Sequence, residues 1–239
     1  MRKGFAYCFN YDAYLNEVMQ GEGVRSVNVM PPGMLGYDET TPIYTYDPAK
    51  CTEMLKQSRW NKNPDGSWTP DPNGEVSLWD TGFRFTVPHS PHGGGMGQIL
   101  QTELGAVNDR FVVEVTGLPL PAFMENYYSG NIPIILDGWM EDIHDPHNWV
   151  VPFTIGSLAA TYNLPSDIRS RFAEIIDRAV TETDPPRRAE IYKEFNQLYY
   201  DTASSIPLFV GTTGGFLHRW LHGWDYNPSC INFYALWKE

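Results

Sequence analysis

The segment 137–149, DGWMEDIHDPHNW, holds the densest group of residues in the chain that could do chemistry. It contains four acids, two histidines and two tryptophans. Three kinds of chemistry are open to such a group: metal binding, acid–base catalysis, and binding of an amine beside aromatic walls. Tryptophan next to charged groups is typical of binding sites, so we expect a ligand here rather than a solvated turn. The candidate metal ligands are Asp142, His144, Asp145 and His147.

Two further segments could bind ions, but each lacks residues that the chemistry requires. The glycine-rich run 89–97, HSPHGGGMG, has no lysine followed by serine or threonine, and His89 and His92 alone are too few ligands for zinc. The run 61–72, NKNPDGSWTPDP, begins like a calcium loop but ends on Pro72, where a bidentate glutamate is needed. We therefore predict a plain connection at the first run and a hairpin turn at the second.

The middle of the chain predicts the elements that must position the segment 137–149. Strands are expected at 83–87, 111–115 and 131–136, and helices at 96–104 and 121–128. This order indicates an α/β layer with at least some parallel pairing. Ligands of such sheets bind beyond the carboxyl ends of the strands, and the segment directly follows the third strand.

The rest of the chain predicts a more helical surround. Asp47 and Asp184 each precede a proline, a pairing that suits the start of a helix. Residues 24–39 are rich in proline and glycine and predict a loop. Further helices are expected within 5–19, from Pro48 to about Ser58, after a cap at Ser166 or Asp167, and from Pro185 onward. A short strand is expected at 207–210.

The composition excludes several classes of protein. The 239 residues, 27.2 kDa, suffice for one large domain or two small ones with a real core. The net charge of −12 makes nucleic acid and anionic membrane surfaces poor partners. An apolar fraction of 42% excludes a disordered chain, and no apolar run approaches the roughly 18 residues of a membrane helix.

The cysteines and the N-terminus carry little signal. Cys8, Cys51 and Cys230 form neither a disulfide framework nor a zinc motif, and we expect them to be small, buried or half-buried residues. Asn10 and Asp12 interrupt the apolar run that a signal peptide would need.

Seven short motifs occur in one order along the chain. They are 2–23 (RKGFAYCFNYDAYLNEVMQGEG), 31–38 (PPGMLGYD), 46–50 (YDPAK), 138–146 (GWMEDIHDP), 183–192 (TDPPRRAEIY), 206–208 (IPL) and 232–237 (NFYALW). In this order they resemble the C-terminal half of family 5 extracellular solute-binding proteins, the peptide-binding components of ABC importers. Each motif is weak alone, but seven in the right order are specific.

The resemblance implies a binding role for Asp142 above all. In peptide-binding members the acid at this place pairs with the α-ammonium group of the ligand. A carboxylate in a closing, water-poor cleft attracts an ammonium group far more strongly than it would in bulk water. Trp139 and Met140 would lie along the ligand backbone. The expected ligand-binding residues are Asp142, Trp139, Met140, Glu141, Asp145, His147 and Trp149.

Three residues depart from the family pattern and leave the ligand class open. Ile143 stands where an aromatic residue is usual, and Glu141 and His144 are atypical. A peptide, another cationic solute and an oligosaccharide all remain possible ligands. Trp139 and Trp149 could serve as the platforms of a sugar site.

The implied fold is an α/β, type II periplasmic-binding-protein lobe with a mixed sheet flanked by helices. Full-length members have two lobes and are roughly twice as long, so this lobe would be incomplete. Residues 1–206 would form the second lobe, and 207–239 the hinge crossover and a segment returning to the first lobe. The first lobe and the signal peptide would lie outside this chain, and a half-cleft alone would bind little ligand.

The resemblance further implies a non-catalytic, extracytoplasmic receptor, periplasmic or at the cell surface, without a cofactor. Its partners would be a peptide or small-molecule ligand, the first lobe, and the membrane subunits of an ABC permease, with no role for nucleic acid. Two alternatives stay open: a metal-dependent hydrolase using Asp142, His144, Asp145 and His147, and an oligosaccharide-binding protein. Pro146 stiffens the turn between the two histidines and disfavours their convergence on one zinc ion.

Overall fold

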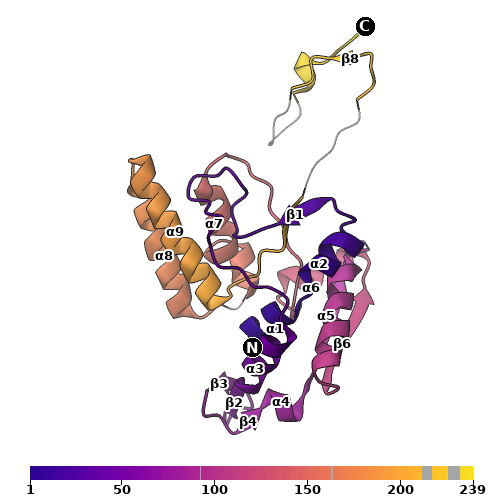
Figure 1. Cartoon of the computed structure of the whole chain (residues 1–239), viewed down its shortest axis with the longest axis vertical. Coiled ribbons are helices and arrows are strands. Elements are labelled where there is room, and N and C mark those ends of the chain that lie inside the picture. Colours follow the sequence, from indigo (N-terminus) through magenta and orange to yellow (C-terminus); the bar gives the residue numbers. More distant parts are fainter. Residues whose placement is uncertain (92, 163, 212–216, 226–231) are drawn as a thin grey trace.

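The computed structural model describes residues 1–91, 93–162, 164–211, 217–225 and 232–239. The described chain is mixed α/β, with short strands and two separate hydrophobic cores. Figure 1 shows α1, α3 and α5 gathered on one side of the molecule and α7, α8 and α9 on the other. The predicted α/β class is confirmed. The helices form two groups, and each group packs around one of the two cores.

The first core forms around a parallel strand pair. β5 (Phe83–His89) and β6 (Phe111–Gly117) pair in register along seven residues, and α5 (Gly94–Val107) connects them. A parallel pair needs such a crossover, because a tight turn can only join antiparallel strands. The two strands, the helix and the parallel pairing are thus confirmed. The glycine-rich run 89–97 is only in part the predicted connection, because residues 94–97 form the first turn of α5. His92 lies outside the described residues.

Two more helices cover this strand pair. α1 (Arg2–Cys8) and α3 (Pro48–Lys56) pack against each other and against α5. Asp47 caps α3 by accepting a hydrogen bond from the backbone N–H of Lys50, as predicted. The predicted helix within 5–19 is broken, because Asn10 caps a new turn and forces the chain to restart. The pieces after the break are α2 (Tyr11–Ala13) and the π-helical η1 (Tyr14–Val18).

The predicted third strand, 131–136, is wrong. Residues 129–145, between α6 (Leu120–Tyr128) and α7 (Pro146–Thr154), form neither helix nor strand. Pro133 lacks the backbone N–H that a strand ladder needs. Ile134 and Leu136 instead pack their half-buried side chains on the first core. The apolar run therefore reflects packing of side chains without strand pairing.

The second core lies among three helices near the end of the chain. α8 (Ser166–Thr181) and α9 (Pro185–Thr202) lie side by side, and α7 packs on α8 (Figure 1). Both predicted helices form, and Asp184 caps α9 as expected. Neither Ser166 nor Asp167 is the cap of α8, because the residue before the helix is Pro165, which makes no side-chain cap.

The remaining elements are short. The predicted hairpin at 61–72 is confirmed, since β2 (Arg59–Lys62) and β3 (Trp68–Pro70) pair as antiparallel strands. The predicted strand at 207–210 starts two residues later, as β7 (Phe209–Gly211). It pairs with β1 (Gly23–Arg25), a strand that the sequence did not predict. The bounds are β1 Gly23–Arg25, β2 Arg59–Lys62, β3 Trp68–Pro70, β4 Val76–Ser77, α4 Leu78–Thr81, η2 Leu158–Tyr162, β7 Phe209–Gly211, β8 Leu221–His222, η3 Phe233–Ala235 and β9 Trp237–Lys238.

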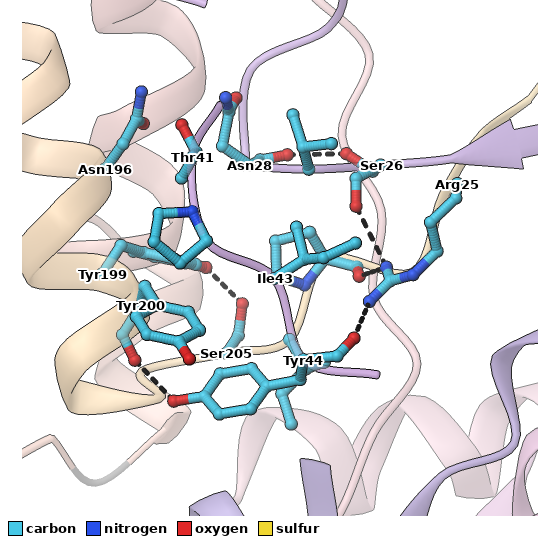
Figure 2. Close-up of a pocket in the computed structure, with 14 residues that line it drawn as sticks. Arg25, Ser26, Asn28, Thr41, Ile43, Tyr44, Asn196, Tyr199, Tyr200 and Ser205 are labelled. Atoms are coloured by element: carbon cyan, nitrogen blue, oxygen red, sulfur yellow. Dashed lines mark hydrogen bonds between the residues drawn. The ribbon is translucent and has the colours of Figure 1, made fainter. Parts of the chain in front are cut away.

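Arg25 joins the loop after β1 to the chain before β7. Its guanidinium lies 3.8 Å from the ring centroid of Tyr11 and donates to the carbonyl oxygen of Leu208. It also donates to the carbonyl oxygens of Pro207 and Tyr44 (Figure 2). The Tyr44 hydroxyl in turn donates to the carbonyl oxygen of Tyr200, 2.5 Å away, at the end of α9. This network of part-buried polar contacts ties the first core to the end of α9, a helix whose other residues pack in the second core.

The C-terminal residues lie apart from both cores. β8 and β9 pair with each other and stand away from the helices in Figure 1. Large apolar side chains there face solvent: Tyr234 is 100% exposed and Phe233 73%, and Trp220, Trp224 and Trp237 are exposed as well. Among the described residues, no helix combines the length and apolar character that crossing a bilayer demands.

Gly36 and Gly33 provide a matched test of how the loop after β1 packs on α9. Both have positive φ, +80° and +88°. A Cβ on Gly36 would lie 2.4 Å from Cβ of the buried Tyr192, whereas a Cβ on Gly33 would meet no atom within 4 Å. We expect Gly33→Ala to lower the free energy of unfolding by about 1 kcal/mol through backbone strain, and Gly36→Ala by about 2–4 kcal/mol through strain plus overpacking. Urea unfolding measures both, and equal losses would contradict this packing.

Candidate functional site

The connector 129–145 crosses from the first core to the second and carries the candidate site. Ile134 and Leu136 pack on the first core, and Trp139 packs on the second. Asp137 lies at the crossing and accepts hydrogen bonds from the hydroxyls of Tyr127, at 3.0 Å, and Tyr162, at 3.1 Å. Burial, together with the Asp137 carboxylate, raises the pKa of both tyrosines, so they remain protonated donors.

Asn148, on the first turn of α7, holds the next part of the connector. Its side-chain oxygen accepts from the indole N–H of Trp139 at 3.0 Å and from the backbone N–H of Asp142 at 3.1 Å. One amide thus fixes the path of the connector on both sides of Met140. The Met140 side chain itself is exposed.

Glu141 is the buried acid of the segment. Its carboxylate accepts from the indole N–H of Trp149 at 3.0 Å and contacts Nδ1 of His144 at 2.9 Å. Burial favours the neutral acid, but the hydrogen bonds from Trp149 and His144 outweigh it and hold the pKa of Glu141 below its ordinary value. Both indole N–H groups of the site, on Trp139 and Trp149, are therefore occupied within the chain.

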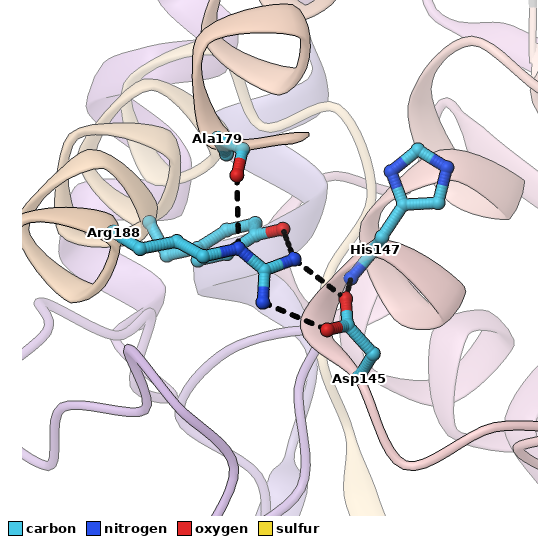
Figure 3. A network of polar contacts seen from close by, with 5 residues as sticks. Asp145, His147, Ala179 and Arg188 are labelled. Carbon is cyan, nitrogen blue, oxygen red and sulfur yellow. Dashed lines mark hydrogen bonds and ion pairs between the residues drawn. The ribbon is translucent and has the colours of Figure 1, made fainter. Parts of the chain in front are cut away.

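Asp145 forms a two-pronged ion pair with Arg188 of α9 (Figure 3). The Nη1 and Nη2 atoms of Arg188 lie 2.7 and 2.8 Å from the two carboxylate oxygens, and its Nε donates to the carbonyl oxygen of Ala179 on α8. Asp145 also caps α7 by accepting from the backbone N–H of His147. The hydrogen bonds from Arg188 hold the pKa of Asp145 below its usual value, although partial burial opposes them. This cluster joins α7, α8 and α9 at one point.

Asp142 is the acid of the segment whose carboxylate is left unused. Among the described residues this carboxylate has no hydrogen-bond or ion-pair partner, while those of Asp137, Glu141 and Asp145 each have at least two. The Asp142 side chain is exposed. The His147 ring is also exposed and points away from the Asp145 carboxylate (Figure 3). The geometry thus leaves one free carboxylate close in sequence to the exposed Met140.

The four candidate metal ligands do not come together. Asp145 is paired with Arg188 and His144 with Glu141, and the described residues hold no group of three or more metal-ligating side chains. The sequence could not show this, because Arg188 lies 43 positions away from Asp145. The arrangement gives no support to the hydrolase alternative.

A cavity of about 20 Å³ lies beside Arg25, between the loop 41–44 and α9. It has room for a water-sized molecule only, and none of the expected ligand residues lines it. The candidate site is instead an open surface formed by the connector.

The comparison with protein families identifies the architecture. Residues 1–159, more than half of the chain, match the sequence model of one protein family. Its description is bacterial extracellular solute-binding proteins, family 5 Middle. The chain belongs to this family of solute-binding proteins. The resemblance inferred from the seven motifs is thereby confirmed.

Two curated proteins of similar sequence match nearly all of this chain. A dipeptide-binding protein of Escherichia coli is 25% identical over 231 residues, covering 95% of this chain and 40% of the relative. A dipeptide-binding protein of Pseudomonas aeruginosa is 23% identical over 237 residues, covering 99% of this chain and 42% of the relative. The chain therefore spans about two-fifths of the length of these relatives.

Solved structures show the same fold. The periplasmic binding protein DppA of Helicobacter pylori, in complex with a peptide, matches with a TM-score of 0.76 and 20% identity over 100% of this chain and 43% of that one. A dipeptide-binding protein of Pseudoalteromonas in complex with Met-Leu matches with a TM-score of 0.76 and 16% identity, over 100% and 45%. The chain thus has a mixed α/β fold that corresponds to part of a periplasmic binding protein.

The segment 137–149 carries the predicted ligand residues, but several residues that hold this segment in place were not among them. Asn148 lies inside the segment, but an amide next to several charged residues gives no distinct signal in the sequence. Arg188 belongs to a family motif, TDPPRRAEIY, which was the one available signal for it. Tyr127 and Tyr162 carry no local signal, because they reach Asp137 only through the tertiary fold.

The Asp145–Arg188 pair predicts an acid-sensitive loss of stability. We expect Asp145→Asn, which keeps an oxygen to cap α7, to lower the free energy of unfolding at pH 7 by about 1–3 kcal/mol. The folded pKa of Asp145 is depressed, so the wild-type advantage is fully present above about pH 4 and shrinks as pH falls through the folded pKa.

Urea unfolding at pH 7 and below pH 4 measures this difference. Asp142→Asn is the matched control in the same segment, and we expect it to change stability by less than about 0.5 kcal/mol. If the two variants lost the same stability at pH 7, the distinction between paired and free carboxylate would be wrong.

Proposed function

We propose that the chain is the ligand-facing C-terminal portion of a peptide-binding receptor that serves an ABC importer. One observation carries this proposal: Asp142 keeps its carboxylate exposed and unpaired, while every other acid of its segment is held by partners in the described part of the chain. A free α-ammonium group is the natural partner of such a carboxylate.

The relatives support peptides as the ligand class. The curated matches from Escherichia coli and Pseudomonas aeruginosa are named dipeptide-binding proteins, and the two matched structures are described with a tetrapeptide, STSA, and with Met-Leu. The exposed Met140 and the backbone around it would contact the peptide main chain, which selects for peptide length more than for side chains. Trp139, Glu141, Asp145 and Trp149 would then shape the wall behind the ligand, and His147 would lie at its edge.

The two-part division of the chain remains part of the proposal. Residues 1–206 would form one lobe, and 207–239 would cross the hinge and pack on another. β7 pairs with β1 at the place where the chain leaves the two cores toward its C-terminus. This strand pair would therefore lie at the hinge between the two lobes. The exposed aromatic residues of 217–239 would be buried against the other lobe. Closure of the two lobes over the ligand would present the receptor to the permease, in an extracytoplasmic compartment.

Substitution of Asp142 tests the proposed ligand contact. In the two-lobed protein that carries this chain, we expect Asp142→Asn to weaken binding of a dipeptide by about 2–5 kcal/mol, because the ligand ammonium loses its partner in a closed cleft. Isothermal titration calorimetry measures the change. Asp177→Asn, an exposed acid on α8, is the matched control for loss of one negative charge and should leave binding unchanged. Equal affinity for the wild type and Asp142→Asn would refute the role of Asp142.

The proposed second lobe predicts weak protection of the C-terminal residues. In the chain 1–239 we expect backbone amides of 217–225 and 232–239 to exchange at least about tenfold faster than those of α8 and α9, because few contacts protect them. In the two-lobed protein the same amides should become protected. Hydrogen exchange followed by mass spectrometry distinguishes the two cases, and strong protection in the chain alone would show that these residues need no second lobe.

A further inference from the structure

Two cysteines of the first core face each other across a helix pair. Cys8 is the last residue of α1 and Cys51 lies in the first turn and a half of α3, and both side chains are 0% exposed. The neighbouring Cys51 thiol, together with burial, raises the pKa of the Cys8 thiol. The two thiols are therefore close enough to interact, and both are shielded from solvent.

The two helices approach each other closely on both sides of these cysteines. Next to Cys8, the carbonyl oxygen of Tyr7 accepts from the backbone N–H of Asp47, 2.8 Å away. One turn earlier in α1, a Cβ on Gly4 would lie 2.8 Å from the side chain of Leu55, one turn after Cys51. The pairs Gly4–Leu55 and Cys8–Cys51 follow each other in antiparallel order along the two helices. A disulfide requires such short separation of the two backbones.

We propose that Cys8 and Cys51 are a disulfide site that links α1 to α3. The bond forms by thiol–disulfide exchange with a small disulfide such as oxidised glutathione. The two protein thiols lose two protons and two electrons as the S–S bond forms between them. The glutathione disulfide takes up these two protons and two electrons and is released as two molecules of reduced glutathione. The bond would close the loop 8–51, which contains the whole segment from η1 to the start of α3. It would thereby restrict the unfolded chain across the part of the molecule that holds Arg25 and Gly36.

The formation of the bond is coupled to folding. In the folded chain the contact with Cys51 and burial raise the pKa of Cys8, so the attacking thiolate is scarce there. Oxidation therefore takes place while α1 and α3 are docking, and the finished core protects the bond from reduction. The exposure of the protein to an oxidising compartment rests on the proposed extracytoplasmic function. The ability of the two thiols to form the bond does not depend on that function.

Oxidative refolding of the chain tests the site. The variant Cys230→Ser, which retains only Cys8 and Cys51, is unfolded in urea and refolded in a mixture of reduced and oxidised glutathione. Mass spectrometry with maleimide labelling should find no free thiol, no attached glutathione, and a mass lower by two hydrogens. Two free thiols, or thiols that carry glutathione, would overturn the proposal.

The chain with all three cysteines tests the pairing. After trypsin digestion the peptides 4–25 and 51–56 should be linked, while the peptide 220–238 should keep the Cys230 thiol. Links to Cys230 would overturn the pairing. The oxidised Cys230→Ser protein should also unfold at a higher temperature than its reduced form, and a lower temperature would show that the bond does not fit the native helix pair. These readouts do not involve peptide binding, so failure of the disulfide site leaves the receptor proposal standing.

Discussion

The ion pair between Asp145 and Arg188 is the constraint on which the candidate site depends. Arg188 binds the carboxylate through two nitrogens and the α8 carbonyl oxygen of Ala179 through the third, while Asp145 caps α7. Three helices of the second core therefore meet at one guanidinium group. Because the connector enters α7 at this point, its last residues have a defined place. A lysine could not make the same set of contacts, since it lacks the planar, forked donor geometry.

The four acids of the connector divide into structural and available carboxylates. Asp137 is held by two tyrosines at the crossing between the cores, Glu141 by Trp149 and His144, and Asp145 by Arg188. Each of these contacts fixes a part of the connector next to Asp142. The neighbours of the free carboxylate are therefore themselves held by hydrogen bonds and ion pairs, as the proposed role of Asp142 in ligand binding requires. Because Asp145 and His144 are held by these contacts, the four candidate metal ligands do not converge on one point.

Local patterns in the sequence predicted most of the helices and the two parallel strands, and they indicated the segment that carries the candidate site. The helix starts at Asp47 and Asp184 depend on the proline that follows each of them, and the strands at 83–87 and 111–115 depend on alternating apolar residues. These signals extend over only a few residues, so the sequence alone predicts the elements. The strand at 131–136 failed because apolar residues satisfied a packing surface while Pro133 prevented a ladder. The free state of Asp142 could not be inferred, because it depends on Asn148, Arg188 and Tyr162 occupying the other polar groups. Ordered motifs supplied the family, whereas long-range contacts decided which acid remains available.

A thermodynamic cycle on the two-lobed protein tests most directly whether Asp142 receives the ligand's ammonium group. Calorimetry gives the affinity of the wild type and of Asp142→Asn for a dipeptide and for the same dipeptide with an acetylated amino group. Acetylation removes the positive charge, so the two changes should be coupled by at least about 1.5 kcal/mol, as close charge pairs are. If acetylation cost the same affinity in both proteins, Asp142 would not be the group that binds the ammonium, and its free carboxylate would need another role.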